Sequence, residues 1–233
     1  MTKLLYMDDM QAREFDAVIT SVSGLDVELD QTLFYPESGG VSCDHGWLIG
    51  SEDYKVTFVK KQPGKILHTV DKPGLAVGDK VHGVLDWDRR HLMMRYHTAA
   101  HLISGVFSNT FGAKITGNQM DPEKGRIDFD LEQFDREMIE RGFGIANELV
   151  AKDYPIKTYY LPRSEVEKNP QLVKLAMGLP PSIQELRIVE IVGFDTQPDG
   201  GCHVSHLKEI GKIEFLSAEN KGKSNRRVYF RLL

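Results

Sequence analysis

The strongest constraint on the fold is a change of pattern at Asp86-Trp87-Asp88. Before this point, short segments that alternate apolar and polar residues are separated by turn formers such as Ser23-Gly24, Gly39-Gly40 and Pro73-Gly74. Several short strands at this spacing are typical of a small β-barrel or sandwich. The expected strands are residues 17–22, 25–29, 54–60, 65–70 and 80–85.

After this point the sequence predicts a long helix over Arg89–Phe111. The segment contains no proline, and its apolar residues recur at helical spacing, from Leu92 and Met93 to Val106. An Asp precedes it as an N-cap, and Gly112 stands just past its end.

The rest of the chain mixes helices and strands. The expected elements are a strand at 126–131, a helix at 134–152, a strand at 156–161, a short helix opening at Ser164, a strand at 186–192, a loop at 195–205 and a terminal hairpin of 211–216 with 227–232. This order predicts an α+β fold with two helices against a mainly antiparallel sheet. We therefore expect two domains, a small β-barrel over residues 1–87 and an α+β domain over 88–233.

Composition places the chain among soluble, globular proteins. Its 233 residues are 41% hydrophobic, which is enough to build real cores. The first ten residues lack the apolar stretch of a signal peptide, and no run approaches the ~20 apolar residues of a membrane span. We expect a cytoplasmic protein with no membrane contact. Only two cysteines occur, Cys43 and Cys202, so a disulfide is not expected.

The net charge of -5 argues against a surface coated with phosphate-binding groups. The last stretch is nevertheless basic, and contact with nucleic acid would be confined to such a patch. The candidate residues are Lys221, Lys223, Arg226 and Arg227. A solvated hairpin turn rich in Lys and Gly is the alternative interpretation of this feature.

The first cluster of possible metal ligands is H-T-A-A-H, His97–His101, inside the expected long helix. Residues four apart lie on one helical face, so both imidazoles can meet a single ion. Two partly buried histidines on an amphipathic helix would give the same pattern. Thr98 stands where H-E-x-x-H proteases carry their general base, which removes most support for a peptidase.

The second cluster is D-G-G-C-H-V-S-H, Asp199–His206, in a loop after a strand. It gathers a carboxylate, a thiol and two imidazoles, all of which are accepted zinc ligands. Gly200-Gly201 leaves the backbone free to fold tightly, so side chains four residues apart can converge. Two His-rich clusters about 100 residues apart favour a metal site.

These motifs together resemble a known family. H-x-x-x-H on a helix, followed about 100 residues later by a second ligand motif, is similar to the editing domain of alanyl- and threonyl-tRNA synthetases. The tail G-C-H-V-S-H-L-K-E-I-G at 201–211 is similar to that family's G-T-H-V-x-x-T-x-E-I-G, and residues 113–117 and 123–129 also match in position. D-Q-T-L-F-Y-P-E-S-G-G at 30–40 resembles the D-Q-T-x-F-Y-P-x-G-G-G-Q-P motif of the barrel that precedes the editing domain.

The resemblance covers nearly the whole chain and points to the free-standing alanyl-tRNA editing proteins of the AlaX family, medium class. It implies a trans-editing, zinc-dependent hydrolase that deacylates seryl- or glycyl-tRNA(Ala), with one zinc per chain, mischarged tRNA(Ala) as partner and no protein partner required. Such an enzyme is useful because a pocket shaped for alanine cannot exclude glycine and rejects an added hydroxyl only ~100-fold.

The resemblance implies His97, His101 and His203 as zinc ligands. The cysteine of the family pattern aligns with Asp199, and Cys202 falls where Thr is usual, so either could complete the site. We favour Asp199, bound directly or through water, with Cys202 lining the pocket. Ser38-Gly39-Gly40-Val41-Ser42 likewise departs from the family's G-G-G-Q-P.

Thr116 matches the family threonine that helps to distinguish serine from alanine, which makes it a candidate catalytic-site residue. A Thr before Gly117 could instead simply open a turn.

Two other functions remain open on the sequence. The chain could be a catalytically inactive zinc-containing tRNA-binding module, which four protein ligands closing the metal's coordination sphere would favour. A metal-independent ester hydrolase has less support, because no G-x-S-x-G motif is present.

Overall fold

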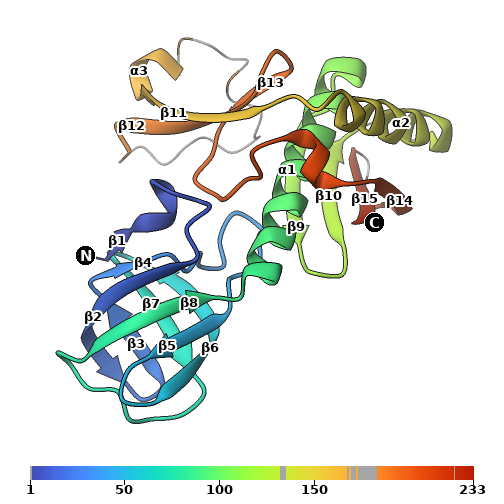
Figure 1. Ribbon diagram of the computed structural model, residues 1–233. Coiled ribbons are helices and arrows are strands. Elements are labelled where there is room, and N and C mark those ends of the chain that lie inside the picture. Colours follow the sequence, from blue (N-terminus) through green and yellow to red (C-terminus); the bar gives the residue numbers. More distant parts are fainter. Residues whose placement is uncertain (1, 132–134, 167, 169–171, 173–182, 223) are drawn as a thin grey trace. The chain divides into compact units, whose positions relative to one another are not determined.

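A computed structural model of the chain describes residues 2–131, 135–166, 168, 172, 183–222 and 224–233 (Figure 1). The chain forms two compact units, Met1–Met93 and Met94–Leu233. The expected α+β fold with an N-terminal barrel is confirmed. The assignment of residues 1–87 and 88–233 as domains with separate functions stays a prediction.

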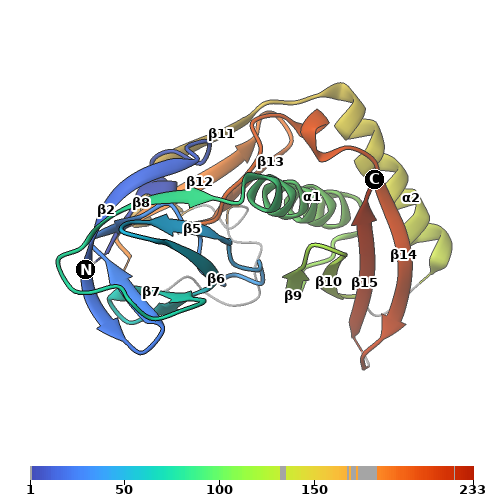
Figure 2. The same ribbon diagram turned by 60° about the horizontal axis from the view of Figure 1, so that its bottom comes forward.

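The first unit contains a closed barrel with strand order β2-β3-β7-β6-β5-β8 (Figures 1 and 2). A small parallel pair, β1 with β4, accompanies it. The elements are β1 (Lys3–Leu4), η1 (Leu5–Met7), β2 (Glu14–Ser23), β3 (Asp26–Leu29), β4 (Gln31–Thr32), β5 (Gly46–Ile49), β6 (Asp53–Gln62), β7 (Lys65–Val70) and β8 (Lys80–Leu85). The five strands predicted for this region are present. β1 and β4, with two residues each, are too short to show an alternating pattern, and the four-residue β5 is a further strand that the sequence analysis does not predict.

The barrel interior is filled by the alternate residues of its strands. On β2, for example, Phe15, Ala17 and Ile19 point inward and are almost fully buried. Edge-to-face contact between Phe15 and Phe34 packs the D-Q-T-L-F motif into this core. Burial of such apolar surface is the main stabilising term of a small barrel.

A buried ion pair fixes the start of helix α1 (Trp87–Phe111) within the first unit. Nε of Arg90 donates to both oxygens of Asp44 at 3.1 and 2.9 Å, and the Arg90 side chain is 1% exposed. Nη2 of Arg90 also donates to the Leu33 carbonyl. The helix begins after Asp86, whose carboxylate accepts from the Arg89 amide as an N-cap, and Gly112 follows its end with φ +70°.

The second unit packs two antiparallel sheets with helices α1 and α2. One sheet has the order β14-β15-β10-β9, and the other has the order β11-β12-β13. The elements are β9 (Ile115–Met120), β10 (Gly125–Asp130), α2 (Arg136–Lys152), β11 (Ile156–Pro162), α3 (Arg163–Val166), β12 (Glu185–Ile191), β13 (Asp195–Pro198), η3 (Leu207–Ile210), β14 (Ile213–Asn220) and β15 (Asn225–Leu232).

The four-stranded sheet and the two long helices share an aromatic core. Phe107 of α1 stacks on Phe129 of β10 with ring centroids 4.6 Å apart, and Phe143 of α2 lies against Phe230 of β15. Gly142 permits this packing, since a Cβ there would lie 2.6 Å from the Phe107 ring. The core therefore holds α1 in a fixed position on the sheet.

Two predictions for the second unit are corrected. The single expected sheet is two sheets, and the segment expected as a loop from Asp195 begins with strand β13. The short β13 follows a turn at Gly193 and, among the described strands, pairs with β12 alone, so its sequence carries little strand pattern. The predicted start of α2 at Phe134 lies outside the described residues, and the helix is described from Arg136 after an Asp135 N-cap.

No helix among the described residues is both long and apolar enough to cross a membrane.

A buried histidine makes the barrel sensitive to acid. His68 donates from Nδ1 to the Val27 carbonyl at 3.3 Å and accepts at Nε2 from the Thr32 hydroxyl at 2.9 Å. Burial lowers its pKa from 6.5 to about 4. Because the folded pKa lies below the unfolded one, the stability contribution is complete above pH 6.5 and is lost as the pH falls toward 4.

We predict that unfolding free energy falls between pH 6.5 and 5 by at most about 1.4 kcal/mol per pH unit from this group. Both tryptophans of the chain, Trp47 and Trp87, lie in the first unit, so urea unfolding followed by their fluorescence reports on that unit. His68→Gln should lose stability at pH 7 and show a weaker pH dependence. Parallel pH curves for the two proteins would contradict this role.

Candidate metal centre

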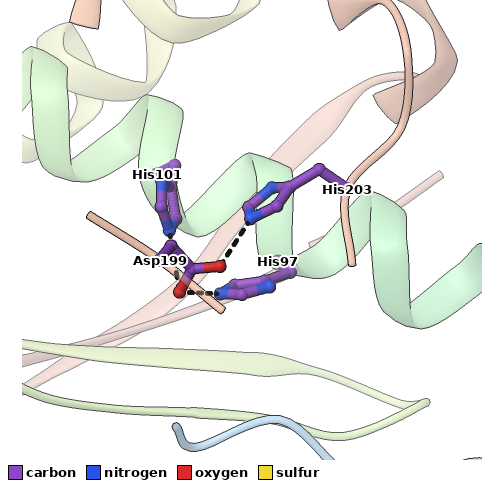
Figure 3. Close-up of side chains that lie close together, drawn as sticks. All are labelled: His97, His101, Asp199 and His203. Carbon is purple, nitrogen blue, oxygen red and sulfur yellow. Dashed lines mark hydrogen bonds and ion pairs between the residues drawn. The ribbon is translucent and has the colours of Figure 1, made fainter. Parts of the chain in front are cut away.

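Helix α1 presents two imidazoles to one side. His97 and His101 lie one turn apart, with ring centroids separated by 5.0 Å (Figure 3). Both are nearly buried, with side-chain exposures of 6% and 11%. The i, i+4 spacing in H-T-A-A-H accounts for this placement.

The segment after β13 brings a carboxylate and a third imidazole to the same place. Nε2 of His203 lies 3.0 Å from Oδ2 of Asp199, and Oδ1 of Asp199 lies 3.6 Å from Nε2 of His97 and 3.9 Å from that of His101. The ligand atoms of all four side chains lie within 4.8 Å of one another. Figure 3 shows the four groups pointing toward a common centre, two from the helix and two from the segment.

An arginine of the neighbouring strand fixes the backbone that carries Asp199. Nη1 of Arg187, on β12, donates to the carbonyls of Gly201 at 2.9 Å and Asp199 at 3.2 Å. The Asp199 amide donates to the Arg187 carbonyl at 3.0 Å, which continues the pairing of β12 with the chain after β13. The carboxylate of Asp199 in turn accepts from the Gly201 amide at 2.6 Å.

The close approach of this segment to α1 requires glycine at position 201. A Cβ built there would lie 2.3 Å from Cε1 of His97, and no real contact is that short. The second glycine of D-G-G-C-H therefore serves close packing against the helix. Gly200, by contrast, has open space where a side chain would be.

Thr98 fixes the orientation of His203. Its hydroxyl donates to the Met94 carbonyl at 2.9 Å, so its lone pairs accept from the Val204 amide at 3.2 Å and from Nδ1 of His203 at 3.1 Å. A proton on Nδ1 leaves the lone pair of neutral His203 on Nε2, which faces Asp199. This is the arrangement in which a histidine ligand donates its other nitrogen to an outer partner.

His97 is oriented in the same way. Its Nδ1 lies 3.3 Å from the Cys202 carbonyl, which can only accept, so Nδ1 carries a proton and Nε2 faces the cluster. The Nε2 atoms of His97 and His203 thus converge with an ionised carboxylate in a buried space. A buried carboxylate needs positive charge beside it, which protonated imidazoles or a metal cation can supply. The donor set therefore fits a metal cation.

The electrostatics agree with this conclusion. Burial acts to raise the pKa of Asp199, but His97, His203 and His101 together hold that pKa well below its ordinary value, so the carboxylate is ionised. Burial and the neighbouring His97 lower the pKa of His203 to about 4, so its imidazole is neutral at pH 7. Metal ligands must be in these protonation states.

The other two candidates in the D-G-G-C-H-V-S-H motif lie differently. Cys202 is buried and supplies its carbonyl to His97, while its thiol does not belong to the group of four ligand atoms found among the described residues. His206 lies further along the chain, where its Nδ1 is 3.5 Å from Oδ1 of Asp153. The ligand set favoured from the sequence, with Asp199 in the fourth position, stays a prediction.

Thr116 is exposed on β9 and occupies a β-bulge. Gly117 pairs with Asp128 and Ile115 pairs with Phe129, so the pairing skips Thr116 as the extra residue. The turn considered as an alternative for this position is absent, because Gly117 lies inside the strand. Bulges often redirect a side chain next to a functional site.

The basic hairpin has much of its charge already paired. Arg226 is 5% exposed and donates to Asn220 and to the Gly222 carbonyl, whereas Arg227 forms two 2.8 Å bonds with Asp128. Lys221 lies 2.7 Å from Glu219. Lys223 lies outside the described residues. The nucleic-acid role of these four residues stays a prediction.

Comparison with known proteins decides the family. The chain is 46% identical to the alanyl-tRNA editing protein AlaX-M of Saccharolobus solfataricus over 99% of this chain and 98% of that protein. It is 44% identical to the AlaX-M protein of Methanosarcina barkeri over the full length of both. The chain belongs to the AlaX-M family of alanyl-tRNA editing proteins.

Two segments of the chain also match families of tRNA synthetases. Residues 3–89 match the family described as class II (A) tRNA synthetases, and residues 186–229 match the second additional domain of threonyl- and alanyl-tRNA synthetases. The alanine–tRNA ligase of Ignicoccus hospitalis is 34% identical over 93% of this chain, which corresponds to 24% of that ligase. The second match includes Asp199 and His203 of the cluster.

The sequence did not single out the residues that position this AlaX-M cluster. In the sequence, Thr98 indicates only that the glutamate of H-E-x-x-H is missing, although a hydroxyl between two helical histidines can also bind a third imidazole. Arg187 could have been noticed as a charge among the apolar residues L-R-I-V of a strand. A buried charge of this kind needs acceptors nearby.

We predict that Thr98→Val lowers the affinity of the protein for added Zn²⁺ by about 10- to 100-fold, because it removes the acceptor that orients His203. Competition against a chromophoric chelator measures this affinity. Thr98→Ser, which keeps the hydroxyl, should retain most of it, and Thr110→Val, at an exposed position of the same helix, should leave it unchanged. Equal affinities for the Thr98→Val and wild-type proteins would rule out the positioning role.

Proposed function

We propose that the chain is an aminoacyl-tRNA deacylase that removes serine or glycine from mischarged tRNA(Ala), with one Zn²⁺ held by His97, His101, His203 and Asp199. Residues 88–233 form its editing domain and residues 1–87 the accompanying barrel domain. It works in the cytoplasm on free mischarged tRNA and requires no protein partner. The observation that carries the proposal is the buried convergence of three imidazoles and one carboxylate in a chain of the AlaX-M family.

Zinc is the metal that suits this set of ligands. Imidazole nitrogens and one carboxylate oxygen in a group of four are typical of tetrahedral zinc sites. When bound, the ion lowers the pKa of a water molecule to about 7 or polarises the ester carbonyl. Ester hydrolysis requires little more than this activation and a correctly placed substrate.

The protein contributes orientation and access. Thr98 and the Cys202 carbonyl hold His203 and His97 with their Nε2 atoms inward. Asp199 has the most exposed side chain of the four, at 21% compared with 0% for His203. The aminoacyl ester therefore approaches the cluster from the side of Asp199 and Gly200, because Gly200 is exposed whereas Gly201, Cys202 and His203 are buried.

Thr116 supplies selectivity in this proposal. Its bulge position on β9 exposes the side chain, and its hydroxyl can hydrogen-bond the hydroxyl of a seryl group. An alanyl group offers no such partner. One hydrogen bond of this kind contributes about 1 kcal/mol, which is a several-fold preference.

A tRNA-binding module without catalysis is the second candidate. The observation in its favour is that four protein ligands, and not three, lie together, because closed sites with four ligands are usually structural. In that case the zinc would stabilise the segment 199–203 and the chain would bind tRNA(Ala) without changing it. Activity measurement separates the two functions directly.

We predict that the purified protein, made without a metal-affinity tag, contains about one zinc per chain and hydrolyses seryl-tRNA(Ala) and glycyl-tRNA(Ala) faster than alanyl-tRNA(Ala). A panel of charged tRNAs, assayed for release of the amino acid, measures this preference. Thr116→Val should reduce the seryl rate several-fold, and Thr116→Ser, which keeps a hydroxyl, should preserve it.

Three outcomes would contradict parts of this proposal. A zinc content near zero after supplementation rejects the metal site. Zinc-loaded protein that binds tRNA(Ala) but hydrolyses none of the esters identifies the binding module. Equal hydrolysis of seryl and alanyl esters by the wild-type protein removes the claimed selectivity.

A further inference from the structure

A second candidate site lies on the outward face of the four-stranded sheet, at the turn between β9 and β10. A pocket of about 190 Å³ opens there, several times the ~30 Å³ share of one water molecule. Its lining residues are Gln119, Asp121, Lys124, Arg126 and Tyr229. Strand pairing places Arg126 between Gln119 on β9 and Tyr229 on β15, so these three side chains lie in a row across the sheet.

The pocket holds two cations whose carboxylate neighbours, Asp128 and Glu219, bind other cations more closely. Lys124 is exposed and lies over the Tyr229 ring, 5.1 Å from its centroid, and it forms no ion pair with the described residues. Nε of Arg126 is buried and has no hydrogen-bond partner within the described part of the chain. Its nearest carboxylate oxygen, Oδ1 of Asp128, is 4.0 Å away and already accepts from Arg227 at 2.8 Å.

One acidic side chain also lines the pocket. Oδ2 of Asp121 accepts from Nε2 of Gln119 at 2.9 Å, which engages that oxygen. The neighbouring Asp128 and Glu219 are each paired more closely with another cation, Arg227 and Lys221, so the pocket keeps a net positive charge. A buried guanidinium nitrogen without an acceptor, beside a free ammonium, is a site for an anion with oxygen acceptors.

The pocket differs in this respect from the basic hairpin. In the hairpin, Arg226 donates to the Gly222 carbonyl of the turn. Arg227 is paired with Asp128, and Lys221 is paired with Glu219. Counterion release requires cations that are not already paired with protein carboxylates. Lys124 and Arg126 meet that requirement better than the described residues of the hairpin do.

We propose that this pocket binds a phosphodiester of the tRNA backbone, with Lys124 and Arg126 as the contacting cations. The inference rests on the proposed function, because it assigns the RNA partner of the editing site. Gln119 lies three residues along β9 from Thr116, about 10 Å at 3.3 Å per residue. With Thr116 at the aminoacyl group, as the proposed function has it, about three stacked nucleotides at ~3.4 Å each cover that distance and bring a backbone phosphate near the 3′ end to the pocket.

Binding of uncharged tRNA(Ala), measured by fluorescence anisotropy at several salt concentrations, tests the proposal. The double variant Lys124→Gln/Arg126→Gln should bind several-fold more weakly, and the slope of log K against log salt should fall by about 1. The charge-preserving variant Lys124→Arg/Arg126→Lys should keep most of the affinity. If both double variants lose affinity equally, the residues act through the fold and the proposal is wrong.

A matched control separates a local contact from the loss of net charge. Lys152→Gln/Arg141→Gln removes the same two charges from exposed positions of α2 in the same unit. It should leave both affinity and salt slope close to the wild-type values. An equal effect of the control and the pocket variant would overturn the proposal, as would an unchanged slope in the pocket variant.

Failure of this inference can be told apart from failure of the proposed function. Hydrolysis of seryl-adenosine, which has no phosphodiester, should be the same in the pocket variant and the wild-type protein, while KM for seryl-tRNA(Ala) rises. A wild-type protein that hydrolyses neither substrate contradicts the proposed function but still permits the binding test. Normal hydrolysis with an unaltered KM for the tRNA ester rejects the pocket alone.

Discussion

The structure around the cluster depends on one constraint, which is that the segment carrying Asp199 and His203 must lie directly against helix α1. Only this approach brings three imidazoles and a carboxylate within 4.8 Å. Glycine at position 201 makes the approach possible, and Arg187 fixes the segment from the other side. Because a buried carboxylate needs positive charge beside it, a cation bound by these four side chains would stabilise the fold.

The close approach of this segment to α1 also depends on hydrogen bonds made by residues outside the cluster. The Thr98 hydroxyl donates its hydrogen bond to the Met94 carbonyl. Its oxygen therefore accepts from the Val204 amide and from Nδ1 of His203. This one side chain thus links helix α1 to the backbone that follows the cluster, and it also fixes the tautomer of His203. Removing it leaves two buried donors without an acceptor, which costs more than a surface hydrogen bond contributes.

Much of the fold and of the cluster could be predicted from the sequence, because the relevant signals are local. The helix over His97 and His101, its caps and the alternating barrel strands all follow from spacing within a few residues. The placement of Arg187 and Thr98 could not be predicted, since it depends on contacts between residues 14 and 105 positions apart. The basic hairpin was predicted from charge alone, and charge does not reveal that Arg227 is paired with Asp128 on a neighbouring strand.

The central claim is that three histidines and Asp199 hold the metal, with Cys202 left out of its coordination. Zinc K-edge absorption on the native protein measures the ligand atoms directly. Coordination by three imidazoles and Asp199 should give a shell of nitrogen and oxygen at about 2.0–2.1 Å with no sulfur. A clear sulfur shell near 2.3 Å would contradict it and place the thiol of Cys202 on the metal, because the only other cysteine, Cys43, is buried in the barrel core.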